Sequence, residues 1–175
     1  EIRRGAYHLK IMGNGGISSP TDRISSDQFS REEIAAVVEE AEMANLYVVV
    51  HAYTARSIIR AVELGVRSVE HGNLADDTAL ALIRARSAFL VPTLSIYRAL
   101  KDEGVAAGLP AELADKIDTV LDAGVETVER AHRIGVQMAY GTDLLGVMHR
   151  LQSREFDLRA DVVPAADLVR AATVN

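Results

Sequence analysis

The chain has 175 residues, 49% of them hydrophobic, which is enough to bury the core of one globular domain and argues against disorder. Its 19 basic and 25 acidic residues give a net charge of −6 with no block of like charge, so neither a nucleic acid nor a membrane surface is an expected partner. Because it has no cysteine, disulfides, thiolate zinc sites and cysteine nucleophiles are excluded, and any metal must be held by other side chains.

The apolar runs of the chain are short. The longest, near Leu46–Val50, is far below the length that crosses a bilayer. The chain begins at Glu1 rather than at a methionine, so a targeting segment could precede it. We therefore leave the cellular location open, with the cytoplasm as the default expectation.

Short apolar runs alternate with longer stretches of helical periodicity, which is the pattern of β/α units. Tyr7–Met12 is the first predicted strand. After a loop rich in Gly, Ser, Pro and Asp, a capping box at Ser30 starts a predicted helix over about 31–45. Leu46–Val50 is then a continuous apolar run, typical of a parallel strand buried on both faces, and it ends at His51.

The alternation continues to the end of the chain. The remaining predicted elements are a helix ending at Gly65, a strand Val66–Glu70, a helix over 77–86, a strand Ala88–Val91, a long helix from Pro110 to Gly135, a strand Val136–Tyr140 and a helix near 164–174. Gly65 and Gly135 stand where glycine commonly follows a helix. The segment between Tyr140 and the last helix is expected to be an irregular loop.

Five strands separated by helices predict an α/β fold with an all-parallel sheet and right-handed crossovers. Two architectures fit this pattern: a doubly wound open sheet, and part of a (β/α)₈ TIM barrel. Five units in 175 residues match the length per unit of a barrel but cannot close one. No linker or internal repeat divides the chain, so a single domain over 1–175 is expected.

Ionisable residues interrupt the apolar pattern near the strand ends. His51, His71 and Asp143 each follow a predicted strand, and Lys10 lies within the first one. Because ligands and catalytic groups gather at the C-terminal ends of parallel strands, these four residues are expected to converge on one mouth. A lysine inside a buried strand is costly unless it is paired or neutral, and a neutral amine can do covalent chemistry.

Each of these residues also has a structural interpretation. A single histidine at a strand end is more often hydrogen-bonded than metal-bound, although two at equivalent positions of consecutive strands favour a site. Asp143, which follows Gly-Thr, could cap the next segment. His8 shares a strand face with Lys10 and could pack there or support the site. His132, near the end of the long helix, is interpreted as structural because a cation there favours the helix dipole.

Six short motifs follow one another along the chain: Leu9–Met12, Gly15–Asp22, His51–Thr54, Ser68–Asn73, Val91–Leu94 and Gly141–Asp143. In this order they resemble the amidohydrolase superfamily, and within it the imidazolonepropionase-like and Xaa-Pro dipeptidase (prolidase-type) metal-dependent hydrolases. The resemblance spans essentially the whole chain. It implies a TIM barrel of the metal-dependent hydrolase type, present as a partial barrel of about five β/α units.

The resemblance also implies a role for particular residues. Lys10 matches a lysine that reacts with CO₂ to give a carbamate bridging two divalent metals, and His51 and His71 match the histidines that bind the more exposed metal. Asp143 matches the aspartate that binds the buried metal and passes a proton from the attacking water to the leaving amine. Tyr97 lies where related dipeptidases place a tyrosine that polarises the substrate carbonyl.

These roles imply a metal-dependent hydrolase that cleaves a peptide or cyclic amide bond through a hydroxide held between two metals. A small peptide or amide is the expected substrate, with dipeptidase or carboxypeptidase-like activity ahead of imidazolone hydrolysis, and lactone or phosphoester hydrolysis left open. One or two zinc ions are the default metal, with manganese or iron as alternatives. His149, in the loop after Asp143, is a further candidate for contact with the substrate.

One element of the superfamily has no counterpart in the chain. Its first barrel strand carries a His-x-His pair, and no two of the five histidines here are separated by one residue. We therefore expect barrel strands one to three to lie upstream of Glu1 or to come from a second polypeptide or a domain-swapped copy. On this expectation the chain is a homo-oligomer or associates with the missing barrel portion, and its own activity is weak or absent.

The alternative is a non-catalytic open α/β domain that binds a small molecule or a partner subunit in its strand-end crevice. Lys10 distinguishes the two hypotheses. In the non-catalytic domain it should be ion-paired, whereas in the hydrolase it should face His51 and His71.

Overall fold

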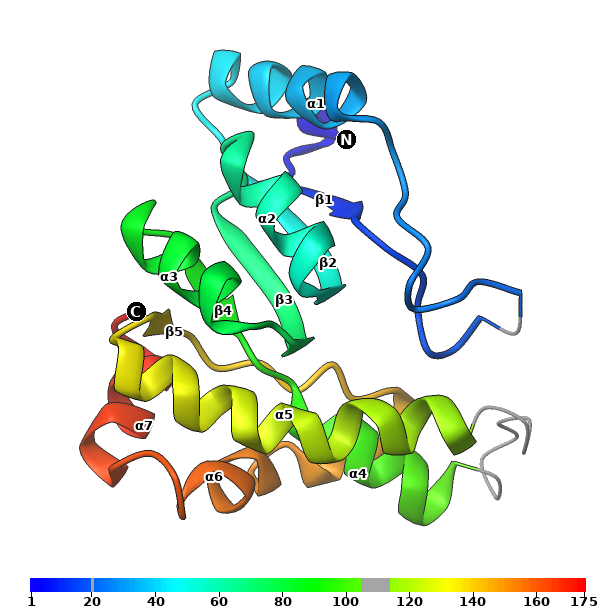
Figure 1. Cartoon of the computed structure of the whole chain (residues 1–175), viewed down its shortest axis with the longest axis vertical. Coiled ribbons are helices and arrows are strands. Elements are labelled where there is room, and N and C mark those ends of the chain that lie inside the picture. Colours follow the sequence, from blue (N-terminus) through cyan, green and yellow to red (C-terminus); the bar gives the residue numbers. More distant parts are fainter. Residues whose placement is uncertain (20, 105–113) are drawn as a thin grey trace.

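The computed structural model describes residues 1–19, 21–104 and 114–175. Its centre is a parallel sheet in the order β1-β2-β3-β4-β5 (Figure 1). The strands are β1 (Leu9–Met12), β2 (Val48–Thr54), β3 (Ser68–Leu74), β4 (Phe89–Val91) and β5 (Gln137–Met138). All four pairings are parallel, which confirms the prediction from the β/α alternation.

The strand order decides between the two predicted architectures. A doubly wound sheet reverses its strand order at a switch point, whereas the strands of a (β/α)₈ barrel follow one another in chain order. Here the spatial order equals the chain order. Within the described residues β1 pairs with β2 and β5 pairs with β4, so the barrel is not closed. The fold is therefore a partial TIM barrel, as predicted.

Helices return the chain from each strand to the next. The helices are α1 (Arg31–Met43), α2 (Ala55–Glu63), α3 (Asp77–Ala85), α4 (Leu94–Glu103), α5 (Ala114–Ile134), α6 (Arg154–Arg159) and α7 (Ala165–Thr173), with short 3-10 helices η1 (Ile2–Arg4) and η3 (Gly146–Leu151). The predicted capping box starts α1, since Ser30 accepts a hydrogen bond from the Glu33 amide and the Glu33 carboxylate accepts one from the Ser30 amide. None of the helices in the described ranges is both long and apolar enough to cross a membrane.

Two hydrophobic cores hold these elements together. The first lies between the sheet and the helices on its outer face, and it includes Val38, Val48, Val50, Ile58, Val62, Leu80, Ile83 and Leu90. The second joins α4 and α5 to the loops that follow the strands, and it includes Ile17, Tyr53, Ile96, Tyr97, Leu121 and Leu144. The opposite face of the sheet, called the inner face below, would line the interior of a closed barrel.

Several predicted boundaries were wrong. The sequence interpretation placed no helix between Pro92 and Pro110, but α4 lies there. It also expected an irregular loop after Tyr140, where the structure has η3 and α6. The last strand is limited to Gln137–Met138. Pro110, the predicted start of the long helix, lies outside the described residues.

The strands β2 and β3 extend beyond the predicted ends. His51 is the fourth residue of β2 and His71 the fourth residue of β3, so both lie within strands rather than after them. Lys10 was expected to be buried inside the first strand, but it is exposed. The reason is that β1 is an edge strand and Lys10 extends from its open inner face.

Candidate active site

Five of the six predicted site residues line one pocket. The pocket has a volume of about 330 Å³ and lies where the inner face of β1–β3 meets α4. Its walls include Lys10, His51, His71, Tyr97 and Asp143. The sixth residue, His149, lies exposed in η3 and is not among the residues that line the pocket.

The two histidine rings lie next to each other. The ring centroids of His51 and His71 are 4.6 Å apart in an edge-on arrangement. The ring of Tyr53 contacts both, at 4.9 Å from His51 and 5.2 Å from His71. Both imidazoles are buried. The structure therefore places the two predicted ligands side by side on the same face of the sheet.

A local irregularity in β3 brings His71 to that face. Glu70 pairs with His51, and His71 pairs with Ala52, whose side chain is buried in the outer core. Regular alternation would therefore point His71 toward the helices. Instead His71 has a φ of 75°, and the register between β2 and β3 shifts just after it. Such a backbone costs about 1–3 kcal/mol outside glycine and is typical of functional sites.

Gly72 continues this irregularity. Its φ is 68°, and a Cβ atom at this position would lie 2.4 Å from Leu90 Cδ1. Glycine is the residue that adopts positive φ without strain and also leaves this space free. The dipeptide His71-Gly72 thus encodes the bulge that turns the imidazole into the pocket.

Hydroxyl groups surround one nitrogen of His71. Its Nδ1 lies 2.7 Å from Thr93 Oγ1 and 2.9 Å from Tyr97 Oη, and the Tyr97 hydroxyl donates to Tyr53 Oη at 3.2 Å. Burial raises the pKa of both tyrosines, so their hydroxyls remain protonated. His71 Nδ1 is therefore held by hydroxyls, and its Nε2 is the nitrogen left to bind a ligand.

His51 has a nitrogen without a partner. Its Nε2 is buried and has no hydrogen-bond partner among the described residues. Burial lowers the pKa of His51 to about 4, with a smaller contribution from the Lys10 ammonium. Burial, the neighbouring His51 and Lys10 lower the pKa of His71 as well. Both imidazoles are therefore neutral near pH 7, which is the form that coordinates metal ions.

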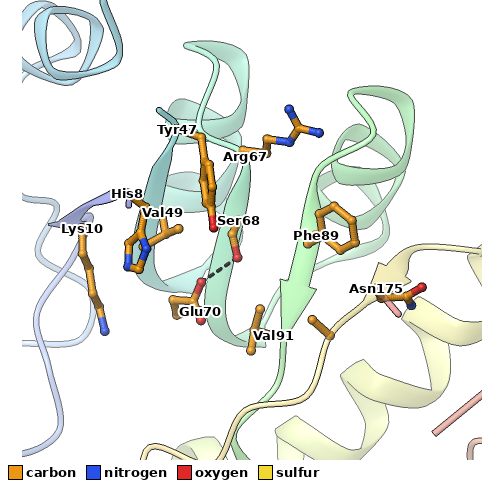
Figure 2. Close-up of a pocket in the computed structure, with 11 residues that line it drawn as sticks. His8, Lys10, Tyr47, Val49, Arg67, Ser68, Glu70, Phe89, Val91 and Asn175 are labelled. Carbon is orange, nitrogen blue, oxygen red and sulfur yellow. Dashed lines mark hydrogen bonds between the residues drawn. The ribbon is translucent and has the colours of Figure 1, made fainter. Parts of the chain in front are cut away.

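Lys10 lies on the inner face between two pockets. It lines the histidine pocket and also a larger pocket of about 640 Å³, shown in Figure 2 with His8 and Glu70. Glu70 accepts a hydrogen bond from Ser68 Oγ at 2.6 Å. Within the described ranges Lys10 forms no salt bridge. The ion pair that the non-catalytic alternative expects for Lys10 is therefore not among the salt bridges of the described residues.

Asp143 approaches the pocket from the segment after β5. It is exposed and has a φ of 51°, so like His71 it holds a left-handed backbone. Partial desolvation raises the pKa of its carboxyl group, and the Lys10 ammonium opposes this shift. Asp143 thus stands in the same pocket as Lys10 and the histidines, but at its exposed rim.

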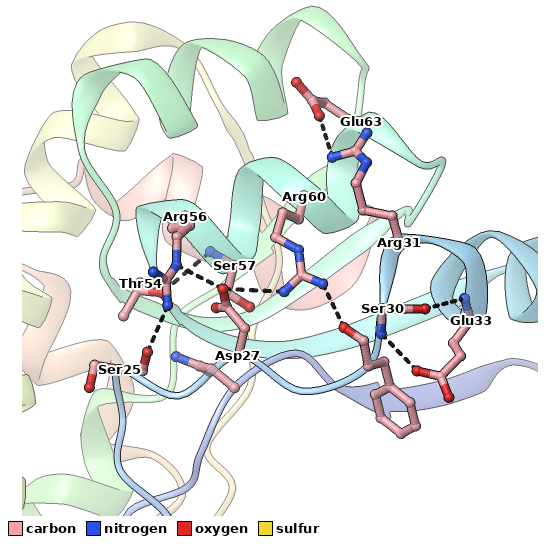
Figure 3. A network of polar contacts seen from close by, with 12 residues as sticks. Ser25, Asp27, Ser30, Arg31, Glu33, Thr54, Arg56, Ser57, Arg60 and Glu63 are labelled. Atoms are coloured by element: carbon pink, nitrogen blue, oxygen red, sulfur yellow. Dashed lines mark hydrogen bonds and ion pairs between the residues drawn. The ribbon is translucent and has the colours of Figure 1, made fainter.

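The loop between β1 and α1 forms another wall of the pocket. It contributes Gly16, Ile17, Ser18, Ser19 and Asp22. Salt bridges fasten its second half to α2, because Asp27 Oδ2 lies 2.7 Å from Arg56 Nε and 3.2 Å from Arg60 Nη1 (Figure 3). Lys116 of α5 fastens the first half by donating to the carbonyl oxygens of Ser19 at 2.7 Å and Asp22 at 2.6 Å.

The donor atoms fit a metal ion held by His51 and His71. The unpartnered Nε2 of His51, the hydroxyl-held Nδ1 of His71 and the adjacency of the two neutral rings all suit two imidazole ligands. No group of three His, Asp or Glu side chains in the described part of the chain is arranged to hold a metal. Within these residues Asp143 is thus not grouped with the two histidines as a set of three ligands.

Sequence reasoning missed two residues of this pocket. Tyr53 stacks on His71, and Thr93 holds its Nδ1. Both stand in motifs that the sequence interpretation used, two residues after His51 and directly after Pro92. Strand alternation alone could have placed Tyr53 beside His51, because residues two apart in a strand share a face.

Comparisons with known proteins agree with this arrangement. The amidohydrolase family profile matches residues 1–175. Ochratoxinase of Aspergillus niger is 31% identical over 176 residues, which cover 100% of this chain and 36% of ochratoxinase. A prolidase solved with N-methylphosphonate-L-proline is 49% identical with a TM-score of 0.96, over 99% of this chain and 42% of the prolidase. A Xaa-Pro dipeptidase with methionine in its active site is 30% identical with a TM-score of 0.88, over 98% of this chain and 43% of the dipeptidase.

This chain belongs to the amidohydrolase family and is similar to its prolidases, as the ordered motifs predicted. It spans 36–43% of the length of the relatives described above.

Proposed function

We propose that this chain carries the part of a metal-dependent amidohydrolase site that holds the more exposed metal, in a hydrolase of small peptides or amides. The observation that carries the proposal is the pair of adjacent neutral imidazoles, His51 and His71, in one pocket with Lys10. The similarity to a prolidase and a Xaa-Pro dipeptidase supports a dipeptidase over the other amide hydrolases.

The proposed ligands are the Nε2 atoms of His51 and His71 and a carbamate on Lys10. In the carbamate the neutral Lys10 amine forms a bond to the carbon of CO₂ and loses one proton, which leaves an anionic group with two oxygens. Zinc bound there would activate water and polarise the substrate carbonyl, which lowers the main barrier to amide hydrolysis. The exposed position of Lys10 gives CO₂ access to its amine.

Three further residues have proposed roles. Asp143 lines the pocket with Lys10 and is the proposed group that takes a proton from water and donates it to the leaving nitrogen. Partial desolvation raises the pKa of its carboxyl group, which favours the protonated form that donates. Tyr97 lines the same pocket and is the proposed group that polarises the substrate carbonyl. His149 is exposed in η3, so its proposed contact with the substrate depends on how far a substrate extends from the pocket.

Zinc binding tests this proposal in the 175-residue chain. Titration calorimetry should show binding that His51→Ala and His71→Ala each weaken at least tenfold, because each removes one of the few protein ligands. His132→Ala is the matched control, since His132 lies in α5 outside the pocket, and it should bind zinc as the unmodified chain does. Zinc affinity that is unchanged in both pocket variants would contradict the proposal.

Catalysis is tested in a polypeptide that supplies all eight barrel strands. Release of proline from Xaa-Pro dipeptides should require added metal, and Asp143→Asn should reduce the rate by about 100-fold or more because a general acid is lost. Turnover by the Asp143→Asn variant at the unmodified rate would contradict the assigned role.

A further inference from the structure

Helix α4 begins without the side-chain cap that its sequence offers. Thr93 is the N-cap residue, and a threonine there usually accepts a hydrogen bond from an amide in the first turn. No such bond is present, and Thr93 Oγ1 instead lies 2.7 Å from His71 Nδ1. The Thr93 hydroxyl therefore contacts His71 instead of capping the helix, and the amides at the start of α4 need another hydrogen-bond acceptor.

Glu155 of α6 is that partner. Its Oε1 accepts a hydrogen bond from the Leu94 amide at 3.1 Å, and its Oε2 accepts one from the Ser95 amide at 2.6 Å. The side chain is fully buried. A carboxylate at this position also interacts favourably with the positive end of the helix dipole. The cap of α4 thus comes from a residue sixty positions further along the chain.

Arg159 balances the buried charge and joins more of the site. Its Nε donates to Glu155 Oε1 at 2.7 Å, and its other nitrogens donate to the carbonyl oxygens of Pro92 and of Ala139, the latter at 3.2 Å. Pro92 directly precedes Thr93, and Ala139 lies on the segment that leads to Asp143. A buried ion pair adds little net stability over apolar residues of the same volume, so its position needs another explanation.

We propose that Glu155, together with Arg159, is a positioning residue for His71. By capping α4 from α6, Glu155 leaves the Thr93 hydroxyl free to hold His71 Nδ1 and fixes Tyr97, one turn further along α4, beside the same nitrogen. The Tyr97 hydroxyl donates to Tyr53, so its oxygen can accept the Nδ1 proton. A neutral imidazole with its proton on Nδ1 presents the lone pair of Nε2 to the pocket.

This inference rests on the proposed function of His71 as a metal ligand, but it can be tested without a metal. Long-range ¹H–¹⁵N NMR spectra of the metal-free chain should show His71 with its proton on Nδ1, and His71→Gln identifies the signals. Glu155→Gln and Thr93→Val should each shift the population toward the other tautomer, whereas Thr93→Ser, which keeps the hydroxyl, should not.

Zinc affinity, measured by competition with a coloured chelator, is the second readout. Loss of a residue that orients a ligand lowers metal affinity by about 10–100-fold, so we expect a drop of at least tenfold for Glu155→Gln and for Thr93→Val. In the variant that combines Glu155→Gln and Thr93→Val, zinc affinity should fall by less than the product of the two single fold-changes, because both substitutions act on His71. Glu103→Gln is the matched control: it breaks the exposed salt bridge of Glu103 with Arg150 at the other end of α4 and should change neither readout.

If Glu155→Gln does not fold, Glu155→Asp replaces it, because the shorter carboxylate keeps its charge beside Arg159 but cannot reach both amides. Folded Glu155 variants with an unchanged His71 tautomer and with zinc affinity within about twofold of the unmodified chain would overturn the proposal. A Thr93→Val variant with an unchanged His71 tautomer and unchanged zinc affinity would overturn it as well. An unmodified chain that binds no zinc would contradict the proposed function, and the tautomer measurement would still decide this inference.

Discussion

At the scale of single residues, burial is the main cause of the lowered pKa of the two histidines, and neighbouring charges contribute less. His51 and His71 are both neutral because the pocket removes them from water, and each keeps a nitrogen for a ligand. The sequence predicted both histidines as site residues because each directly follows a segment that was predicted to be a strand. It did not predict that His71 needs a positive φ to join His51, since a bulge depends on the register between two strands.

The low pKa of His51 predicts how stability depends on pH in the metal-free chain. In the unfolded chain His51 has the ordinary pKa near 6.5, whereas in the folded chain its pKa is about 4. Its contribution to the unfolding free energy is therefore fully present above pH 6.5 and is lost as the pH falls toward 4, because the unfolded chain binds the proton first. The difference corresponds to at most about 3 kcal/mol. His71 acts in the same direction.

Urea denaturation between pH 4 and pH 7.5 measures this effect. His51→Leu should flatten the dependence of the unfolding free energy on pH, because it removes the group whose pKa differs between the two states. His149→Gln, at an exposed position in η3, should leave the slope unchanged. Equal slopes for His51→Leu and the unmodified chain would show that His51 does not carry the effect.

At the scale of elements, helices with local signals were predicted and helices held by distant contacts were missed. The capping box at Ser30 and the alternation of apolar residues identified α1 to α3. The N-terminus of α4 is instead capped by Glu155, and α6 is a six-residue helix anchored by the same buried ion pair. These contacts cannot be predicted from the residues next to α4 in the sequence, because they form only when α6 packs on α4.

The loop that follows β1 gives a prediction at this scale. Asp27→Asn should lower the unfolding free energy by about 1–2 kcal/mol, because it weakens charged hydrogen bonds to Arg56 and Arg60. Hydrogen exchange of the amides in 23–29 should also become faster, since this segment loses its attachment to α2. Chemical denaturation and exchange measured by mass spectrometry check the two effects.

Glu63→Gln is the control for Asp27→Asn. It removes the salt bridge between Glu63 and Arg31, which is exposed on both sides and is expected to contribute no more than about 0.5 kcal/mol. If both variants lose the same small amount of stability, Asp27 does not fasten the loop.

At the scale of the whole molecule, the chain has the strand order of a barrel but not its closure. Strand alternation predicted the five parallel strands, and the ordered motifs predicted the family. The exposure of Lys10 was not predicted, because burial of a barrel lysine depends on strands beyond those in this sheet. Lys10 instead lines a pocket of about 640 Å³ on the open inner face of the sheet (Figure 2).

The central claim is that His51 and His71 bind one metal ion in this pocket. Anomalous diffraction at the zinc absorption edge, from crystals of the chain grown with zinc, tests it most directly. We predict a peak about 2.0–2.1 Å from the Nε2 atoms of both His51 and His71, on the side of the pocket that Lys10 lines. A zinc peak that contacts neither histidine, or a pocket without a peak at saturating zinc, would contradict the claim.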